Sequence, residues 1–139
     1  MEFRRFDDAY VIRMDRGEEI VSCLTALCQQ EGIRLASVEA IGALDRAVVG
    51  LYDVNEKAYH KKEFNEPLEL TSLLGTVTEK DGQPYLHLHA TFCDARMQAH
   101  GGHVNELHIS ATCEMVLRLI PGGVGRRPDE VTGLNLFNF

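Results

Sequence analysis

The chain has 139 residues, of which 45% are hydrophobic and 25% charged, and these values exclude disordered and fibrous classes because they are typical of globular proteins. No run approaches the ~18 consecutive apolar residues of a membrane span, and residues 1–15 carry charges instead of an apolar signal sequence. The net charge of −7 argues against a general nucleic-acid surface, since an acidic chain repels phosphate backbones. We therefore expect a cytoplasmic protein with a single domain over residues 1–139.

The first part of the chain predicts a strand followed by an amphipathic helix. The strand covers residues 8–14, and Asp15 then stands where it can cap a helix that begins near Gly17. Glu18, three residues after Asp15, would complete a capping box, and Gly32 would end the helix. Five apolar residues share one face of this helix: Ile20, Val21, Leu24, Leu27 and Cys28.

The remainder of the chain predicts strands, at residues 35–41, 47–54, 58–64, 68–78, 85–93, 107–120 and 130–139. Gly42 should break the first of these from the second, and Asp81-Gly82 predicts a hairpin turn. In residues 107–120 the alternation places one set of side chains inward: Leu107, Ile109, Ala111, Cys113, Met115, Leu117 and Leu119. The pattern favours an α+β fold, with a large, mostly antiparallel β-sheet and one main amphipathic helix.

Two apolar or uncovered surfaces of this sheet predict contact between subunits. Residues 130–139 are apolar on both faces of the expected strand, and the outer face of residues 85–93 also lacks a cover. One helix cannot cover both faces of so large a sheet. We therefore expect a symmetric subunit interface.

Histidines are concentrated between Tyr85 and His108. His87 and His89 are two residues apart on a predicted strand, so both imidazoles leave the same face. His103 follows Gly101-Gly102, and two consecutive glycines allow a tight turn or a close approach of two backbones. If the chain returns antiparallel, His103 comes back beside the other two. Three imidazoles with an open fourth position are typical of a zinc site and also suit nickel, iron or cobalt.

Other polar residues near this cluster are weaker ligand candidates. His100 and His108 could contribute around the metal, or they could be ordinary surface histidines. Glu106 could orient an imidazole, or it could be a solvated carboxylate. His60 lies in a polar run and is expected to be solvated.

Separate blocks over nearly the whole chain resemble the PPC domain (plants and prokaryotes conserved domain) in its stand-alone prokaryotic form, which is related to the domain of AT-hook nuclear proteins. The blocks are YVIRMDRGEEIVSCL, IGAL, EPLELTSLLGTV, LHLHATFCDARMQAHGGHVNE and TGLNL. The resemblance implies an α+β fold assembled as a homotrimer. It also implies a bound metal, zinc or another divalent transition metal, at His87, His89 and His103, with Glu106 at the family's acidic position.

The AT-hook that precedes this domain in plants enters the minor groove of DNA through an Arg-Gly-Arg-Pro element. This chain has Gly125-Arg126-Arg127-Pro128, in which the order of residues differs, and we interpret the segment as a solvated turn. The family's Gly-Arg-Phe-Glu-Ile segment corresponds to residues 66–70 here, which lack the arginine.

Three functions remain open from the sequence. The first is a homotrimeric metal-binding protein of unassigned biological role and unknown small-molecule ligand. An open metal position would acidify a bound water, so a metal-dependent hydrolase with Glu106 as base is an extension of it, although no catalytic residue or substrate pocket is indicated. The second is a DNA-binding or DNA-associated regulatory protein, a family-level expectation that the net charge of −7 does not support. The third is a structural trimer whose histidines only pack an interface.

Overall fold

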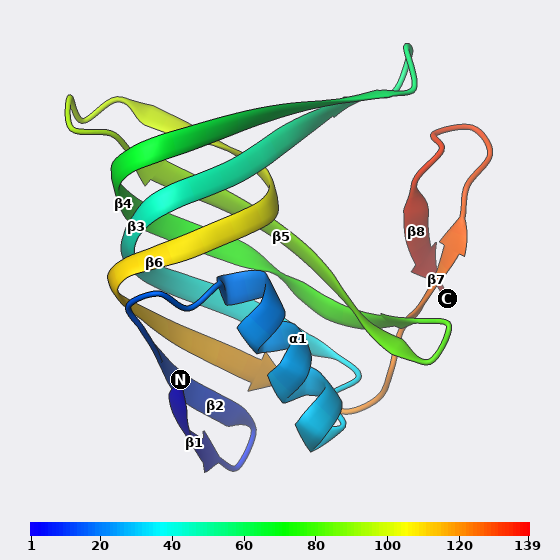
Figure 1. Ribbon diagram of the computed structural model, residues 1–139. Helices are drawn as coiled ribbons and strands as arrows, with labels where there is room; N and C mark the ends of the chain where they lie inside the picture. Colours follow the sequence, from blue (N-terminus) through cyan, green and yellow to red (C-terminus); the bar gives the residue numbers. More distant parts are fainter.

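The computed structural model describes residues 1–139, in which eight strands form one sheet and a single helix packs against it (Figure 1). The strands are β1 (Glu2–Phe6), β2 (Ala9–Asp15), β3 (Ala36–Asp53), β4 (Ala58–Lys80), β5 (Gln83–Cys93), β6 (Ala99–Leu119), β7 (Gly125–Pro128) and β8 (Asn135–Asn138). The helix α1 spans Ile20–Glu31. The predicted α+β class, with one helix and a mostly antiparallel sheet, is confirmed. No helix has the length and hydropathy needed to span a membrane.

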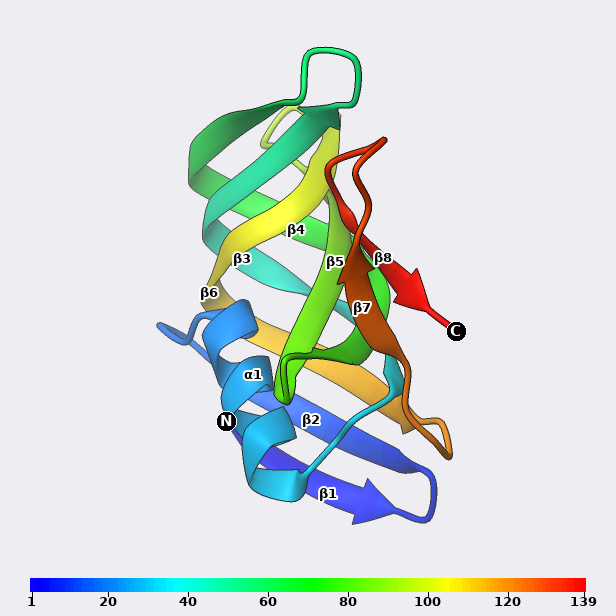
Figure 2. The same ribbon diagram turned by 90° about the vertical axis from the view of Figure 1, so that its right-hand side faces the viewer.

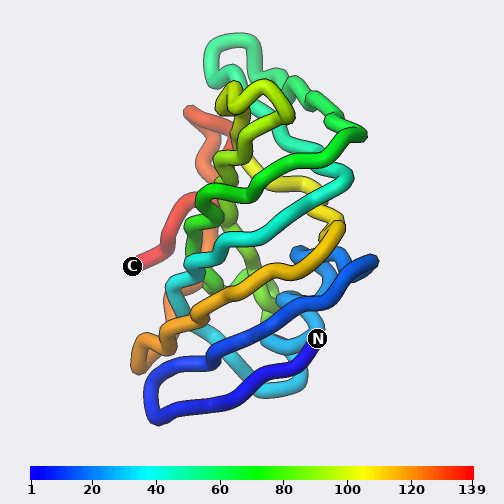
Figure 3. Tube along the Cα trace, turned by 90° about the vertical axis from the view of Figure 1, so that its left-hand side faces the viewer, coloured from blue at the N-terminus to red at the C-terminus, as the bar shows by residue number.

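The sheet curls and closes on itself. Its strand order is β1-β2-β6-β3-β4-β7-β8, and Figure 3 shows the first five of these side by side across the face turned away from α1. The strand β5 pairs antiparallel with β4 along one edge and with the first residues of β6 along the other. Four long strands, β3 to β6, therefore form a ring of backbone hydrogen bonds in one part of the molecule.

The core lies between the sheet and α1. In β2 the alternation is clean, since Tyr10, Ile12 and Met14 are buried whereas Val11 is exposed on the opposite face. The helix buries Ile20, Leu24, Leu27 and Cys28 against this inner face, as its periodicity predicts.

The start of α1 differs from the prediction. Its N-cap is Glu19, whose carboxylate accepts hydrogen bonds from the backbone N–H groups of Val21 and Ser22. Asp15 is instead the last residue of β2, and its N–H donates to the Glu18 carboxylate at 2.7 Å. Gly17 adopts a left-handed conformation, φ 87°, so the chain turns there and the helix begins three residues later. The predicted end at Gly32 is confirmed, because Gly32 is the left-handed C-cap with φ 65°.

Two pairs of predicted strands are continuous in the structure, and Gly42, which was expected to break one of them, lies inside β3. Gly42 sits within β3 where that strand approaches β6 so closely that a Cβ would lie 2.5 Å from the Thr112 carbonyl oxygen. Register shifts flank it, and one of them turns Ala111 outward, contrary to its predicted inward position. The strands predicted at residues 58–64 and 68–78 are likewise one strand, β4. Pro67 lies in it at a register shift and has no partner in the ladder, so the N–H that proline lacks is not needed there.

The carboxyl-terminal segment forms a hairpin instead of the single strand predicted for residues 130–139. Asp129 accepts hydrogen bonds from both the N–H and the hydroxyl of Thr132, and Gly133 has φ 77°, so the chain reverses between β7 and β8. Arg126 and Arg127 therefore belong to a strand, not to a solvated turn. The hairpin joins the main sheet through one parallel pair, Glu79 with Gly125, and stands beside β5 (Figure 2). The strand β1, which the sequence analysis missed, pairs with β2 at the other end of the sheet.

Candidate metal centre

Three histidines come together where β5 meets the first residues of β6. His87 and His89 leave the outer face of β5, while Leu88 and Ala90 between and after them are buried. His103 on β6 is the direct cross-strand partner of His89. The predicted return of His103 to the pair is therefore confirmed, and regular strands hold all three side chains.

The three imidazole rings form a nearly equilateral triangle. Their centroids are 5.1 Å apart for His87 and His89, 5.3 Å for His87 and His103, and 5.4 Å for His89 and His103. One ligand nitrogen from each ring can be chosen so that all three lie within 4.8 Å of one another. The Nε2 atoms of His87 and His89 are 3.2 Å apart.

The surroundings favour the neutral imidazoles that metal ions require. Partial burial lowers the pKa of His87, and the charges of His89 and Arg126 lower it further. Burial likewise lowers the pKa of His103, with smaller contributions from His87 and His89. Both rings are therefore neutral at pH 7, with a lone pair available on one nitrogen.

Close backbone packing at Gly101 and Gly102 sets the position of His103. A Cβ on Gly101 would overlap the Ala90 carbonyl oxygen of β5, and one on Gly102 would lie 2.7 Å from the Gly50 carbonyl oxygen of β3. The start of β6 is thus held tightly between two neighbouring strands. Only glycine permits this approach. Of the two roles that the sequence allowed for the glycine pair, a tight turn or a close approach of two backbones, the structure therefore has the close approach.

A tyrosine supports the His103 ring from the side. The rings of Tyr59 and His103 meet edge to face with centroids 6.1 Å apart, and the Tyr59 hydroxyl accepts a hydrogen bond of 2.6 Å from the Asn105 side chain. Gly50 makes room for the Tyr59 ring, since any Cβ there would collide with it. Tyr59 is not recognisable from the sequence as part of the site, because the strand pairing that brings it to His103 spans more than 40 residues of chain.

All three histidines line a cavity of about 610 Å³. Its walls come from β3, β4, β5, β6 and the β7–β8 hairpin, and they include Tyr52, Tyr85, Arg126, Leu134 and Leu136. None of its lining residues is aspartate or glutamate. Arg126 was not expected here, since its segment was interpreted as a solvated turn.

The other sequence candidates have different partners. His100 lies on the opposite face of its strand from His103, where it packs against Phe64 and Phe92 and contacts Asp94 at 3.0 Å. Glu106 and His108 contact each other and Arg46 on the outside of the sheet. None of the three lines the cavity, and His60 is exposed. Glu106, named from the sequence as the nearest base, is thus ion-paired with Arg46 away from the cluster.

The donor set and its spacing suit a transition metal ion. Tetrahedral coordination with metal–nitrogen bonds of about 2.0–2.1 Å places ligand nitrogens roughly 3.4 Å apart. The 3.2 Å between two Nε2 atoms is close to that value, and a small closure brings in the third nitrogen. Three imidazoles would leave a fourth position open toward the cavity.

Comparison with known proteins agrees with this architecture. Residues 1–121 match the family model of the Plants and Prokaryotes Conserved (PCC) domain, the family named above by its other abbreviation. The crystal structure of a candidate DNA-binding protein from Bacteroides thetaiotaomicron has a TM-score of 0.97 and 28% identity, covering 99% of this chain and 96% of that one. The structure of a metal-containing protein from Archaeoglobus fulgidus has a TM-score of 0.86 and 36% identity over 100% of both chains.

A curated sequence relative is much longer than this chain. The bifunctional protein GlmU of Synechococcus is 34% identical over 127 residues, which are 89% of this chain but 19% of that protein. The similarity therefore concerns about a fifth of the relative's length.

The packing at Gly101 generates a prediction. We expect Gly101→Ala to destabilise the protein by about 1–3 kcal/mol, because the added methyl group forces β5 and β6 apart. Gly125→Ala is the matched control, since a Cβ there meets nothing within 4 Å. Urea unfolding measures both variants, and equal stability of the two would show that the close approach at Gly101 does not constrain the sheet.

Proposed function

The chain belongs to the plants and prokaryotes conserved domain family, and from this premise we propose that it is a metal-binding protein that holds zinc or another divalent transition metal at His87, His89 and His103. One observation carries the proposal: three imidazoles from two paired strands converge with ligand nitrogens within 4.8 Å of one another. The metal-containing relative from Archaeoglobus fulgidus, 36% identical over the full chain, supports it.

The cavity favours ligand binding over hydrolysis by groups of this chain. A metal ion bound here would supply Lewis-acid chemistry to a ligand oxygen at its open position. The chain's own part is to hold the imidazoles rigidly on strands, with Tyr59 supporting His103. No carboxylate lines the cavity and Glu106 is engaged by Arg46, so the chain offers no carboxylate base beside the cluster.

Metal content tests this proposal. Protein purified without an affinity tag or chelator should contain about one transition metal ion per chain, and His87→Ala should weaken binding by more than the 10–100-fold typical of losing a group that only orients a ligand. His60→Ala is the matched control, because that histidine is exposed and outside the cluster. Elemental analysis and a zinc titration measure these values, and a chain that takes up no metal on dialysis would contradict the proposal.

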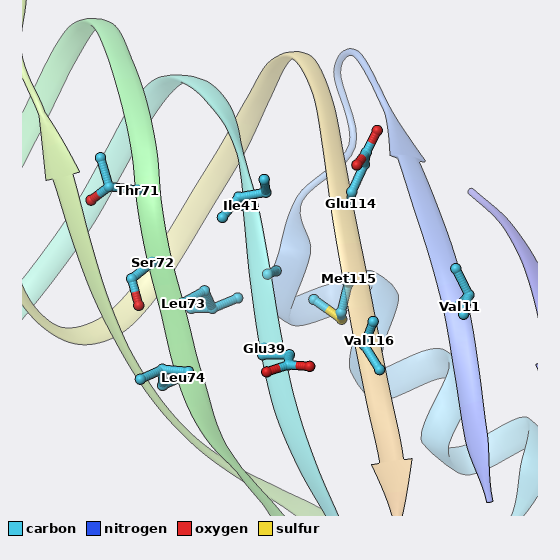
Figure 4. A pocket seen from close by; sticks show the side chains of 11 residues that line it. Val11, Glu39, Ile41, Thr71, Ser72, Leu73, Leu74, Glu114, Met115 and Val116 are labelled. Carbon is cyan, nitrogen blue, oxygen red and sulfur yellow. The ribbon is translucent and has the colours of Figure 1, made fainter.

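The uncovered face of the sheet supports assembly into a homotrimer. On the side away from α1, apolar side chains from several strands lie exposed around a shallow pocket, including Val11 at 50%, Ile41 at 57% and Leu74 at 58% exposure (Figure 4). Exposed apolar patches of this kind commonly mark subunit contacts. We infer that further copies of the chain cover this face.

Ile41→Glu should therefore disrupt the assembly, because it buries a charge in an apolar contact. We expect the variant to sediment as a smaller species than the unmodified chain at the same concentration. Met97→Glu, which changes an equally apolar and 80% exposed side chain in the β5–β6 loop, should not alter the sedimentation. Sedimentation velocity of an unmodified chain that is monomeric would remove the inference.

DNA association is the second candidate, favoured by the name of the relative from Bacteroides thetaiotaomicron. The charges give it little support, since Arg34, Arg46 and Arg118 pair with carboxylates of the chain itself. If several free lysines and arginines do meet phosphates, duplex binding should fall steeply as salt rises. A mobility shift that appears at low salt and disappears with added salt would support this candidate, and no complex at micromolar protein would exclude it for this chain.

A further inference from the structure

We propose that the cavity over the three histidines binds the carboxylate of a small organic acid with an apolar body, and that Arg126 is the residue that receives the carboxylate. The inference deepens the proposed function, since it names the ligand class of the same site. Its central observation, an arginine without an acidic partner, is independent of the metal.

Arg126 is held in place by neutral groups only. Its Nε donates to the Thr78 hydroxyl at 2.9 Å, and its Nη1 donates to the Asn135 carbonyl oxygen at 3.0 Å. The guanidinium lies over the rings of Tyr85 and Phe137, with its central carbon 4.8 and 4.3 Å from their centroids. These contacts fix the plane of the group without neutralising its charge.

The remaining nitrogen, Nη2, is buried and has no hydrogen-bond partner. A buried charged donor without a partner is costly, and a native structure that contains one calls for an explanation such as a ligand or ion. Burial also lowers the pKa of Arg126, whereas Arg34 and Arg46, which pair with carboxylates, have raised pKa values. Arg126 is thus a half-buried cation that lacks its anion.

The charges of the residues that line the cavity also favour an anionic ligand. The chain carries a net charge of −7, yet no aspartate or glutamate lines this cavity. Three neutral imidazoles would leave the charge of a bound divalent metal uncompensated. The side chains that line the cavity thus include the cationic Arg126 and no carboxylate, which favours the carboxylate of a ligand there.

The single arginine and the apolar walls of the cavity favour a carboxylate over a phosphate as the bound anion. Phosphate groups are usually held by several cations or by a group of backbone N–H donors, whereas a single guanidinium matches the planar fork of one carboxylate. Tyr52, Tyr85, Leu134 and Leu136 offer aromatic and aliphatic surface to the rest of the ligand. A volume of about 610 Å³ lies in the range of small-molecule sites.

Access to Nη2 involves the β7–β8 hairpin. Neighbouring atoms cover Nη2, although Arg126 itself lines the cavity. The hairpin meets the main sheet at one backbone pair, Glu79 with Gly125, and the Asn135 carbonyl that accepts from Nη1 lies on it. For a carboxylate to reach Nη2, β8 has to move slightly away from the Arg126 side chain.

The test compares phenylacetate with its neutral analogue phenylacetamide and with phenyl phosphate, by NMR titration of metal-free and zinc-treated protein. We expect phenylacetate to bind with a dissociation constant on the order of 1 mM or tighter, as befits so small a ligand. Phenylacetamide should bind at least about tenfold more weakly, because it cannot pair with the guanidinium charge.

Variants assign the effect to Arg126. Arg126→Gln should weaken phenylacetate binding at least about tenfold, whereas Arg127→Gln, an exposed neighbour on the same strand, should leave it unchanged. Arg126→Lys keeps the charge without the fork and should fall between them. If Arg126→Gln fails to fold, the Arg126→Lys variant and the comparison of phenylacetate with phenylacetamide decide the matter.

Several outcomes would overturn the inference. Equal binding of acid and amide, no binding of phenylacetate, or tighter Arg126-dependent binding of phenyl phosphate would each reject a carboxylate site. Dissociation of the assembly in Arg126→Gln would assign the residue to a subunit contact. Arg126-dependent binding to a chain that takes up no metal would uphold the inference while contradicting the metal-binding function, so the two can fail separately.

Discussion

The closure of the sheet at the start of β6 is the constraint on which the rest of the site depends. His103 belongs to two ladders at once, paired with His89 of β5 and with Gly50 of β3. That double pairing requires backbones so close that Gly101 and Gly102 cannot carry a Cβ. Because the imidazoles leave regular strands instead of loops, their separation is set by strand spacing and little entropy is lost when a ligand draws them together.

The charge distribution gives the cavity a character opposite to that of the whole molecule. No carboxylate of this acidic chain lines the cavity, and several carboxylates pair with arginines elsewhere on the molecule, as in the contacts of Arg46 with Glu63 and Glu106. The cavity contains only imidazoles, phenol groups, apolar side chains, an amide and one arginine. The positive charge of this site therefore lies inside the cavity, where it can attract a small anion to the guanidinium or to a bound metal. It does not form a surface that would attract the phosphates of a nucleic acid.

The sequence predicted the cluster well because its signals are local. A period of two places His87 and His89 on one face, and the glycine pair before His103 permits the close return. Where the sequence failed, long-range pairing decides the outcome. Gly42 suggested a strand break but serves a close approach to β6, and Arg126 suggested a solvated turn but lies over the Tyr85 and Phe137 rings. Such contacts join segments far apart in the chain, and no local pattern records them.

The β7–β8 hairpin is attached to the main sheet separately from the β5–β6 ladder, so the site consists of two parts that can change independently. The three histidines lie within residues 1–121, which match the family model, whereas Arg126, Leu134 and Leu136 lie beyond it. Substitutions or insertions in the hairpin leave the β5–β6 ladder intact, because one backbone pair connects it to the main sheet. A mutation in the hairpin can thus alter the wall that contacts the ligand without displacing the metal ligands, so ligand selectivity and metal affinity can be changed separately in this protein.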